Sequence, residues 1–242
     1  MSNIVSLNFD KHSQLRVQAS QRHSSAINQH LMPVVPAEFG RASSCFPIIV
    51  TKNADTGEFT FSAMMGFQPG ENLFVREGRW DAYYEPLQIQ RQPFFVGDDQ
   101  DSKVVCFDSD SLALSDDDGE PLFNAQSQAS DYLLTVQQIL TQLMSGEIES
   151  QKLVIQLVEL KLLTPFSLDI EFTDRSKQAV QGAYMIDENK LAELDDKVVL
   201  RLYRSGVIGL MHNLQTSMHQ LPNLIARKNR MLDTAKSWFE SA

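Results

Sequence analysis

The sequence contains little cysteine and has no long apolar run. Cys45 and Cys106 are its two cysteines, which are too few for the disulfide framework of a small secreted domain. The longest apolar region, residues 153–166, is interrupted by a glutamine, a glutamate and a lysine, whereas a membrane-spanning helix needs about 18 or more consecutive apolar residues. We therefore expect two buried, reduced thiols and no membrane span.

The first residues also lack the signature of export. They show neither the basic start nor the apolar run and small-residue cleavage site of a secretory signal. We therefore expect a cytoplasmic protein, and secretion without a signal peptide stays open.

Sequence motifs of several enzyme classes are absent as well. The chain has no Gly-x-Ser-x-Gly nucleophile elbow, no phosphate-binding loop ending in Gly-Lys-Ser/Thr and no Gly-x-Gly-x-x-Gly dinucleotide fingerprint. It also has no His-Glu-x-x-His zinc motif. The sequence therefore names no reaction and no catalytic residue.

The chain has more acids than bases, and the excess is local. Its 31 acidic and 21 basic residues give a formal net charge of −10, which argues against a broad basic surface for nucleic acid. Nine of the acids lie in residues 98–120, where Lys103 is the one base. We predict that this segment is solvated and turn-forming. The run Asp116–Gly119 does not match the ligand spacing of an EF-hand, so whether the segment binds cations stays open.

Hydrophobic patterning predicts one compact α+β unit, with a β-rich N-terminal half that has hairpins and a helical C-terminal half packed around a later β-hairpin. A polar N-terminal arm, residues 1–30, carries a short strand near Ile4. In the β-rich half, 31–125, residues 47–51 and 58–65 predict a hairpin around a turn-forming segment.

The helical half, residues 126–242, contains the clearest hairpin of the chain at 166–186, where apolar and polar residues alternate. A helix before this hairpin is predicted to break at Ser145-Gly146, because glycine disfavours a helix interior. Pro222 is predicted to stop or kink the C-terminal helical region. The basic cluster Arg227, Lys228 and Arg230 predicts a solvated helix face.

Turn-rich segments of the β-rich half bring aromatic, charged and amide side chains close together in the sequence. Amphipathic rings beside fixed charges are typical of ligand or peptide recognition, and loops on a rigid scaffold often carry binding groups. An aromatic corner that only packs this half is the alternative. The predicted ligand-binding residues are Glu38, Glu71, Asn72, Arg79, Trp80, Asp81 and Tyr83.

A metal site is the second hypothesis. His23, His30 and Glu38 supply two imidazoles and one carboxylate, which is the ligand set of many non-haem Fe(II) oxygenases. Locally hydrogen-bonded histidines are the alternative. No cofactor is predicted under the binding hypothesis, and Fe(II) is predicted only under this one.

Short motifs follow one another in a fixed order along the chain. They begin with Pro33-Val34-Val35-Pro36-Ala37-Glu38-Phe39, Phe46-Pro47-Ile48-Ile49-Val50, Gly66-Phe67-x-Pro69-Gly70-Glu71-Asn72 and Arg79-Trp80-Asp81-x-Tyr83, and they end with Gly182-x-Tyr184-x-Ile186-Asp187-Glu188 and Ser205-Gly206. This ordered series resembles the bacterial SapC family over residues 20–232, a family named after a surface-layer-associated protein. The resemblance implies a setting in gene clusters that also encode TonB-dependent receptors, flavin-dependent halogenase-like proteins and cupin-type oxygenase-like proteins, and it implies no catalytic residue.

Together, the residues and the resemblance favour a soluble, non-catalytic binding or accessory protein in a bacterial nutrient-uptake or ligand/surface-protein modification system. Its partner would be an unknown small molecule, peptide or protein, and the oligomeric state stays open. An iron-dependent oxygenase and a surface-layer-associated structural protein are the alternatives.

Overall fold

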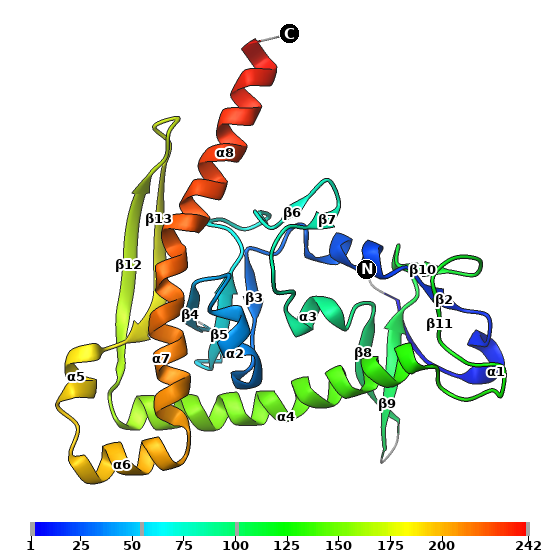
Figure 1. The fold of residues 1–242 in the computed structure, drawn as a ribbon, viewed down its shortest axis with the longest axis horizontal. Helices are drawn as coiled ribbons and strands as arrows, with labels where there is room; N and C mark the ends of the chain where they lie inside the picture. Colours follow the sequence, from blue (N-terminus) through cyan, green and yellow to red (C-terminus); the bar gives the residue numbers. More distant parts are fainter. Residues whose placement is uncertain (1–2, 54–55, 100–101, 241–242) are drawn as a thin grey trace. The chain divides into compact units, whose positions relative to one another are not determined.

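The structure is a computed structural model, and it describes residues 3–53, 56–99 and 102–240 (Figure 1). The chain forms two compact units whose segments alternate along the sequence. Unit 1 consists of Met1–Ile27, Val75–Asp81 and Glu85–Ser145. Unit 2 consists of Asn28–Phe74, Ala82–Tyr84 and Gly146–Ala242. Each unit therefore draws on both the predicted β-rich half and the predicted helical half.

Unit 1 contains small antiparallel sheets around an apolar core. One sheet has the strand order β1-β9-β8, and another has the order β10-β2-β11. Buried apolar side chains, among them Val17, Phe94, Phe107 and Leu122, form the core. The strands are β1 (Ile4–Ser6), β2 (Arg16–Val17), β6 (Val75–Arg76), β7 (Arg79–Trp80), β8 (Phe94–Asp99), β9 (Ser102–Asp108), β10 (Leu114–Ser115) and β11 (Glu120–Pro121). The short helices are α1 (Phe9–His12), η1 (Ala19–Ala26) and α3 (Leu87–Gln90).

Unit 2 contains a five-stranded antiparallel sheet of order β12-β13-β4-β5-β3. Both predicted hairpins are confirmed, because β4 pairs with β5 and β12 pairs with β13. Part of the turn predicted between β4 and β5, residues 54–55, lies outside the described residues. The strands are β3 (Leu31–Pro33), β4 (Ile48–Lys52), β5 (Phe59–Met64), β12 (Leu163–Glu171) and β13 (Lys177–Ile186).

Helices cover this sheet, and α7 contacts both α2 and β13 (Figure 1). Gly206 has a φ of 79° where α6 gives way to α7, a conformation that glycine adopts without strain. Pro222 is the second residue of α8. The first N–H groups of a helix have no carbonyl acceptor within that helix, so proline costs no hydrogen bond at this position. The helical segments are η2 (Pro36–Glu38), α2 (Phe39–Ala42), α5 (Glu188–Ala192), α6 (Asp196–Arg204), α7 (Val207–Ser217), η3 (Met218–Gln220) and α8 (Leu221–Glu240).

The predicted helix break at Ser145-Gly146 is wrong. Helix α4 runs from Asp131 to Glu159 without interruption. A Cβ atom added at Gly146 would lie 2.6 Å from the Cβ of Val35. The absence of a side chain at Gly146 therefore allows α4 to pack closely against Val35. The helix continues through this position despite the low helix propensity of glycine.

The α+β fold class is confirmed, since helices and antiparallel sheets share the chain. None of the helices in the described part of the chain combines the length and the apolarity that a membrane crossing requires.

Candidate functional site

Glu38 is fully buried, and its carboxylate accepts hydrogen bonds from groups of unit 2. One oxygen accepts a hydrogen bond from the Val35 N–H (3.1 Å), and the other accepts one from the Tyr84 hydroxyl (2.8 Å). The Arg41 guanidinium lies 5.1 Å from the centroid of the Tyr84 ring. Glu38 therefore caps the short helix η2 and fixes Tyr84, and direct ligand binding by Glu38 would have to replace these hydrogen bonds.

Glu71 and Asn72 also bind groups of their own unit. Glu71 Oε2 accepts from the Phe67 N–H (2.8 Å), and Glu71 Oε1 forms an ion pair with Lys228 Nζ. Asn72 Oδ1 accepts from the Phe74 N–H (2.9 Å). Both side chains of the ion pair are only 8 % exposed. The prediction of a solvated helix face is therefore wrong for Lys228. Its ion pair links α8 to the loop that contains Glu71.

The other predicted ligand-binding residues are divided between the units. Arg79, Trp80 and Asp81 belong to unit 1, where the hairpin β6-β7 holds the first two. The Asp81 carboxylate lies 3.8 Å from Arg76 at the surface. Tyr83 belongs to unit 2 and is fully exposed.

The three residues of the predicted iron site have separate surroundings. His23 belongs to unit 1, and its Nε2 lies 3.0 Å from Glu85, which is also paired with Arg22. His30 belongs to unit 2, as does Glu38. Burial lowers the pKa of His30, and the charge of Glu71 opposes this shift. Among the residues that the structure describes, no three His, Cys, Asp or Glu side chains gather in a way that could hold a metal ion.

Tyr132, in unit 1, has a shifted ionisation that can be tested. Burial raises the pKa of Tyr132 to about 12, with a smaller opposing effect from Arg22 and smaller raising effects from Glu120 and Glu85. Above pH ~10 the unfolded chain releases this proton while the folded chain retains it. The free energy of unfolding should therefore fall as the pH rises from about 10 to about 12.

We expect Tyr132→Phe to make this alkaline decline shallower. Urea unfolding of the variant and the wild type below and above pH ~10 measures how steeply the free energy of unfolding declines. An equally steep decline in the variant and the wild type would show that the tyrosine proton is not involved.

A pocket of about 300 Å³ lies within unit 2 beside α8. We call it the arginine pocket, because two arginines are its charged lining residues. Arg227 is held from two sides: its guanidinium lies 4.3 Å from the centroid of the Phe74 ring, and its Nη1 donates to the Leu73 carbonyl at 3.3 Å. The residues that line the pocket are Ser44, Cys45, Phe74, Ala82, Tyr83, Gln220, Asn223, Ala226, Arg227 and Arg230.

Of the residues predicted for ligand binding, Tyr83 is the one that lines this pocket. The predicted ligand-binding residues did not include the arginines, although the basic cluster was recognised in the sequence and the spacing of Arg227 and Arg230 places both on one helix face. Their partners in the pocket come from distant segments around Cys45, Phe74 and Tyr83, and a single sequence gives no signal for that association.

Comparison with known proteins identifies the family. The SapC family model matches residues 7–224. No curated protein and no solved structure matches the chain. Since the family model spans most of the sequence, the chain belongs to the SapC family.

Proposed function

We propose that this protein is a non-catalytic binding protein that recognises an anionic group in the arginine pocket, as an accessory component of a bacterial uptake or modification system. The observation that carries the proposal is the composition of the pocket: Arg227 and Arg230 line it together with Tyr83, and no aspartate or glutamate is among its described lining residues. The accessory role rests on family membership and on the setting that the resemblance implies.

The chemistry of the lining residues supports an anionic ligand. A guanidinium is planar and permanently charged, and it can donate two parallel hydrogen bonds to a carboxylate or phosphate. The contacts of Arg227 with Phe74 and Leu73 hold one such group in place before a ligand arrives. Preorganisation of this kind reduces the entropy lost on binding.

Tyr83 and the amides supply the rest of a recognition surface. The fully exposed Tyr83 side chain presents an apolar ring with a polar hydroxyl, and such rings are common in binding sites. Gln220 and Asn223 add neutral donors and acceptors at the same pocket. The pocket therefore combines charge, hydrogen bonding and one aromatic surface.

Cys45 allows binding to be measured directly, because this thiol lines the pocket and is partly exposed, whereas burial was predicted for it; Cys106 is buried as predicted. In a Cys106→Ser background, Cys45 is the single cysteine of the chain. We expect inorganic phosphate or citrate to slow the reaction of Cys45 with a maleimide in a saturable manner, at constant ionic strength. Arg230→Ala should weaken this protection about tenfold or more, because hydrogen bonds to charged groups contribute about 1.5–3 kcal/mol.

Arg201→Ala is the matched control, because Arg201 is exposed on α6 and does not line the pocket. It should leave the protection unchanged. The proposal fails if neither anion protects Cys45 beyond the effect of chloride at equal ionic strength, or if Arg227→Ala, Arg230→Ala and Arg201→Ala behave alike.

A further inference from the structure

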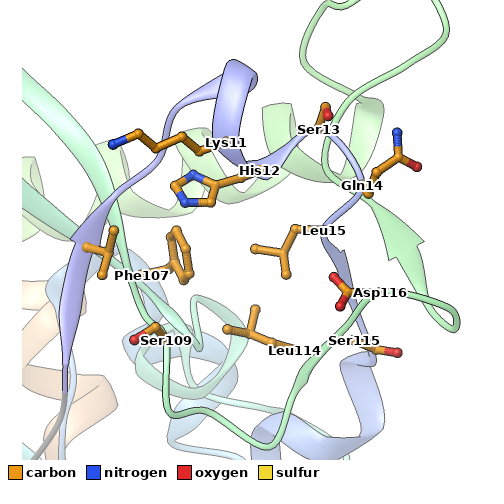
Figure 2. Close-up of a pocket in the computed structure, with 11 residues that line it drawn as sticks. Lys11, His12, Ser13, Gln14, Leu15, Phe107, Ser109, Leu114, Ser115 and Asp116 are labelled. Carbon is orange, nitrogen blue, oxygen red and sulfur yellow. The ribbon is translucent and has the colours of Figure 1, made fainter.

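A second pocket, of about 390 Å³, lies within unit 1 (Figure 2). We call it the His12 pocket. It is independent of the arginine pocket, since the two share no lining residue. Its lining residues are Val5, Lys11, His12, Ser13, Gln14, Leu15, Phe107, Ser109, Leu114, Ser115 and Asp116.

One side of the His12 pocket carries hydrogen-bond donors. His12 Nδ1 accepts from the Asn8 N–H at 3.0 Å, so the proton of the neutral ring must lie on Nε2, which becomes a donor. The ring also packs edge-on against Phe107, with centroids 5.0 Å apart and an interplanar angle of 86°. The imidazole is therefore fixed in position and tautomer. Lys11, its neighbour in the sequence, also lines the pocket, and Figure 2 shows its extended side chain with the amino group beyond the imidazole, on the side away from Asp116.

The other side carries the carboxylate of Asp116, and the turn that holds Asp116 is well fixed. The Ser115 hydroxyl accepts hydrogen bonds from the N–H groups of Asp117 (3.2 Å) and Asp118 (3.1 Å). The next residue, Gly119, has a φ of 108° and approaches Val17 so closely that a Cβ atom would lie 2.4 Å from the Val17 carbonyl oxygen. The backbone of this turn therefore packs closely against strand β2, and it places Asp116 among the residues that line the pocket.

Apolar side chains lie between these two sides. Figure 2 shows Leu15 and Leu114 between His12 and Asp116, with the Phe107 ring beneath the imidazole. The pocket thus offers a donor side with a positive charge, an apolar middle and a side with a negative charge. Pockets with an apolar lining and a few placed polar groups orient small molecules.

We propose that the His12 pocket binds a zwitterion that carries a carboxylate, an ammonium group and an apolar side chain, which is chemistry shared by apolar amino acids and their short peptides. The carboxylate pairs with Lys11 and the His12 Nε2–H. The ammonium group pairs with Asp116. The apolar side chain covers Leu15 and Leu114. A zwitterion forms ion pairs on both sides of the pocket, whereas a ligand with one charge forms an ion pair on one side only, and this difference in contacts makes the site favour zwitterions.

Titration calorimetry with the full chain tests each part of this assignment through matched ligands. L-Leucine carries all three groups, 4-methylpentanoate lacks the ammonium group, 3-methylbutylamine lacks the carboxylate, and glycine lacks the apolar side chain. We expect L-leucine or L-leucyl-L-leucine to bind most tightly. The ratio of these two affinities shows whether the pocket prefers a free amino acid or a short peptide. Each truncated ligand should bind about tenfold or more weakly than L-leucine.

Two variants should show a crossed pattern. Asp116→Asn should weaken L-leucine about tenfold or more while leaving 4-methylpentanoate unchanged. Lys11→Met should weaken L-leucine and 4-methylpentanoate while leaving 3-methylbutylamine unchanged. Asp117→Asn is the matched control, because it removes the same charge from the same turn at a residue that does not line the pocket. Arg230→Ala should have no effect here, which separates this site from the arginine pocket.

The assignment is overturned if no zwitterion binds saturably at millimolar concentration. It is also overturned if Asp116→Asn and Asp117→Asn change L-leucine affinity equally, since the contribution of Asp116 would then be its general charge. Tighter binding of 3-methylbutylamine than of L-leucine would show a cation site in place of a zwitterion site.

Discussion

Lys228→Met should lower the free energy of unfolding by about 3–5 kcal/mol, the largest loss we expect from any single substitution in α8. The variant keeps a long apolar stem but removes the cation that faces Glu71. The Glu71 carboxylate, only 8 % exposed, would then lie buried beside the Phe67 N–H without its opposite charge. The cost comes from leaving that charge uncompensated, because burial removes the water that would otherwise solvate it.

A double variant distinguishes this cause from a loss of packing. Glu71→Gln with Lys228→Met retains an acceptor for the Phe67 N–H but removes both charges, so it should be clearly more stable than Lys228→Met alone. Lys236→Met provides the control on the same helix, because Lys236 is exposed; it should change stability by at most ~0.5 kcal/mol. Urea denaturation measures all three. A loss below about 1 kcal/mol in Lys228→Met would show that the pair is far better solvated than its burial implies.

Gly146→Ala should destabilise the protein, although helix propensity alone predicts the opposite. In an unobstructed helix interior, replacing glycine by alanine gains up to about 1 kcal/mol. Here the new methyl group would lie 2.6 Å from the Val35 Cβ and 2.9 Å from both Val35 Cγ atoms. Relieving such an overlap in a packed core costs about 1–3 kcal/mol. We therefore expect a net loss of about 1–2 kcal/mol in urea denaturation.

Gly209→Ala in α7 is the matched control, because nothing lies within 4 Å of a Cβ atom built at Gly209. It should be neutral or stabilising by up to ~1 kcal/mol. Val35→Gly removes the obstructing side chain, so Gly146→Ala should cost less in that background than in the wild type. Equal costs in the two backgrounds would show that another contact causes the loss.

The periodic elements of this fold could be predicted from the sequence, because their cause is local. Alternation of apolar and polar residues predicted the hairpin of β12 and β13. In β12 the exposed and more buried positions alternate as expected, whereas in β13 the alternation holds only up to Gln181, where the pairing register with β12 shifts. The two-residue strands β2, β10 and β11 could not be predicted in this way. They exist only because distant segments pair, and a segment of two residues has no period to detect.

The candidate sites could be predicted only in part for a related reason. Tyr83 was identified from its neighbours in the sequence, and it does line the arginine pocket. Glu38 and Glu71 were identified by the same reasoning, yet their oxygen atoms bind backbone and side-chain groups nearby. A carboxylate that caps a turn and a carboxylate that awaits a ligand occur in similar turn-rich sequences. What separates them is burial and tertiary partners, such as Lys228, which lies 157 residues away from Glu71.

The alternation of the two units along the chain has a consequence for how this protein can be dissected. The chain passes between the units at residues 27/28, 74/75, 81/82, 84/85 and 145/146, so neither unit is encoded by one continuous stretch. A single truncation that keeps one unit complete therefore also keeps segments of the other: residues 1–145 retain 28–74 and 82–84 of unit 2, and residues 28–242 retain 75–81 and 85–145 of unit 1. A library of terminal deletions should give few stably folded products. Exchange of one pocket between relatives would require several coordinated segment replacements. Point substitutions in the full chain are therefore the direct way to assign a function to each pocket.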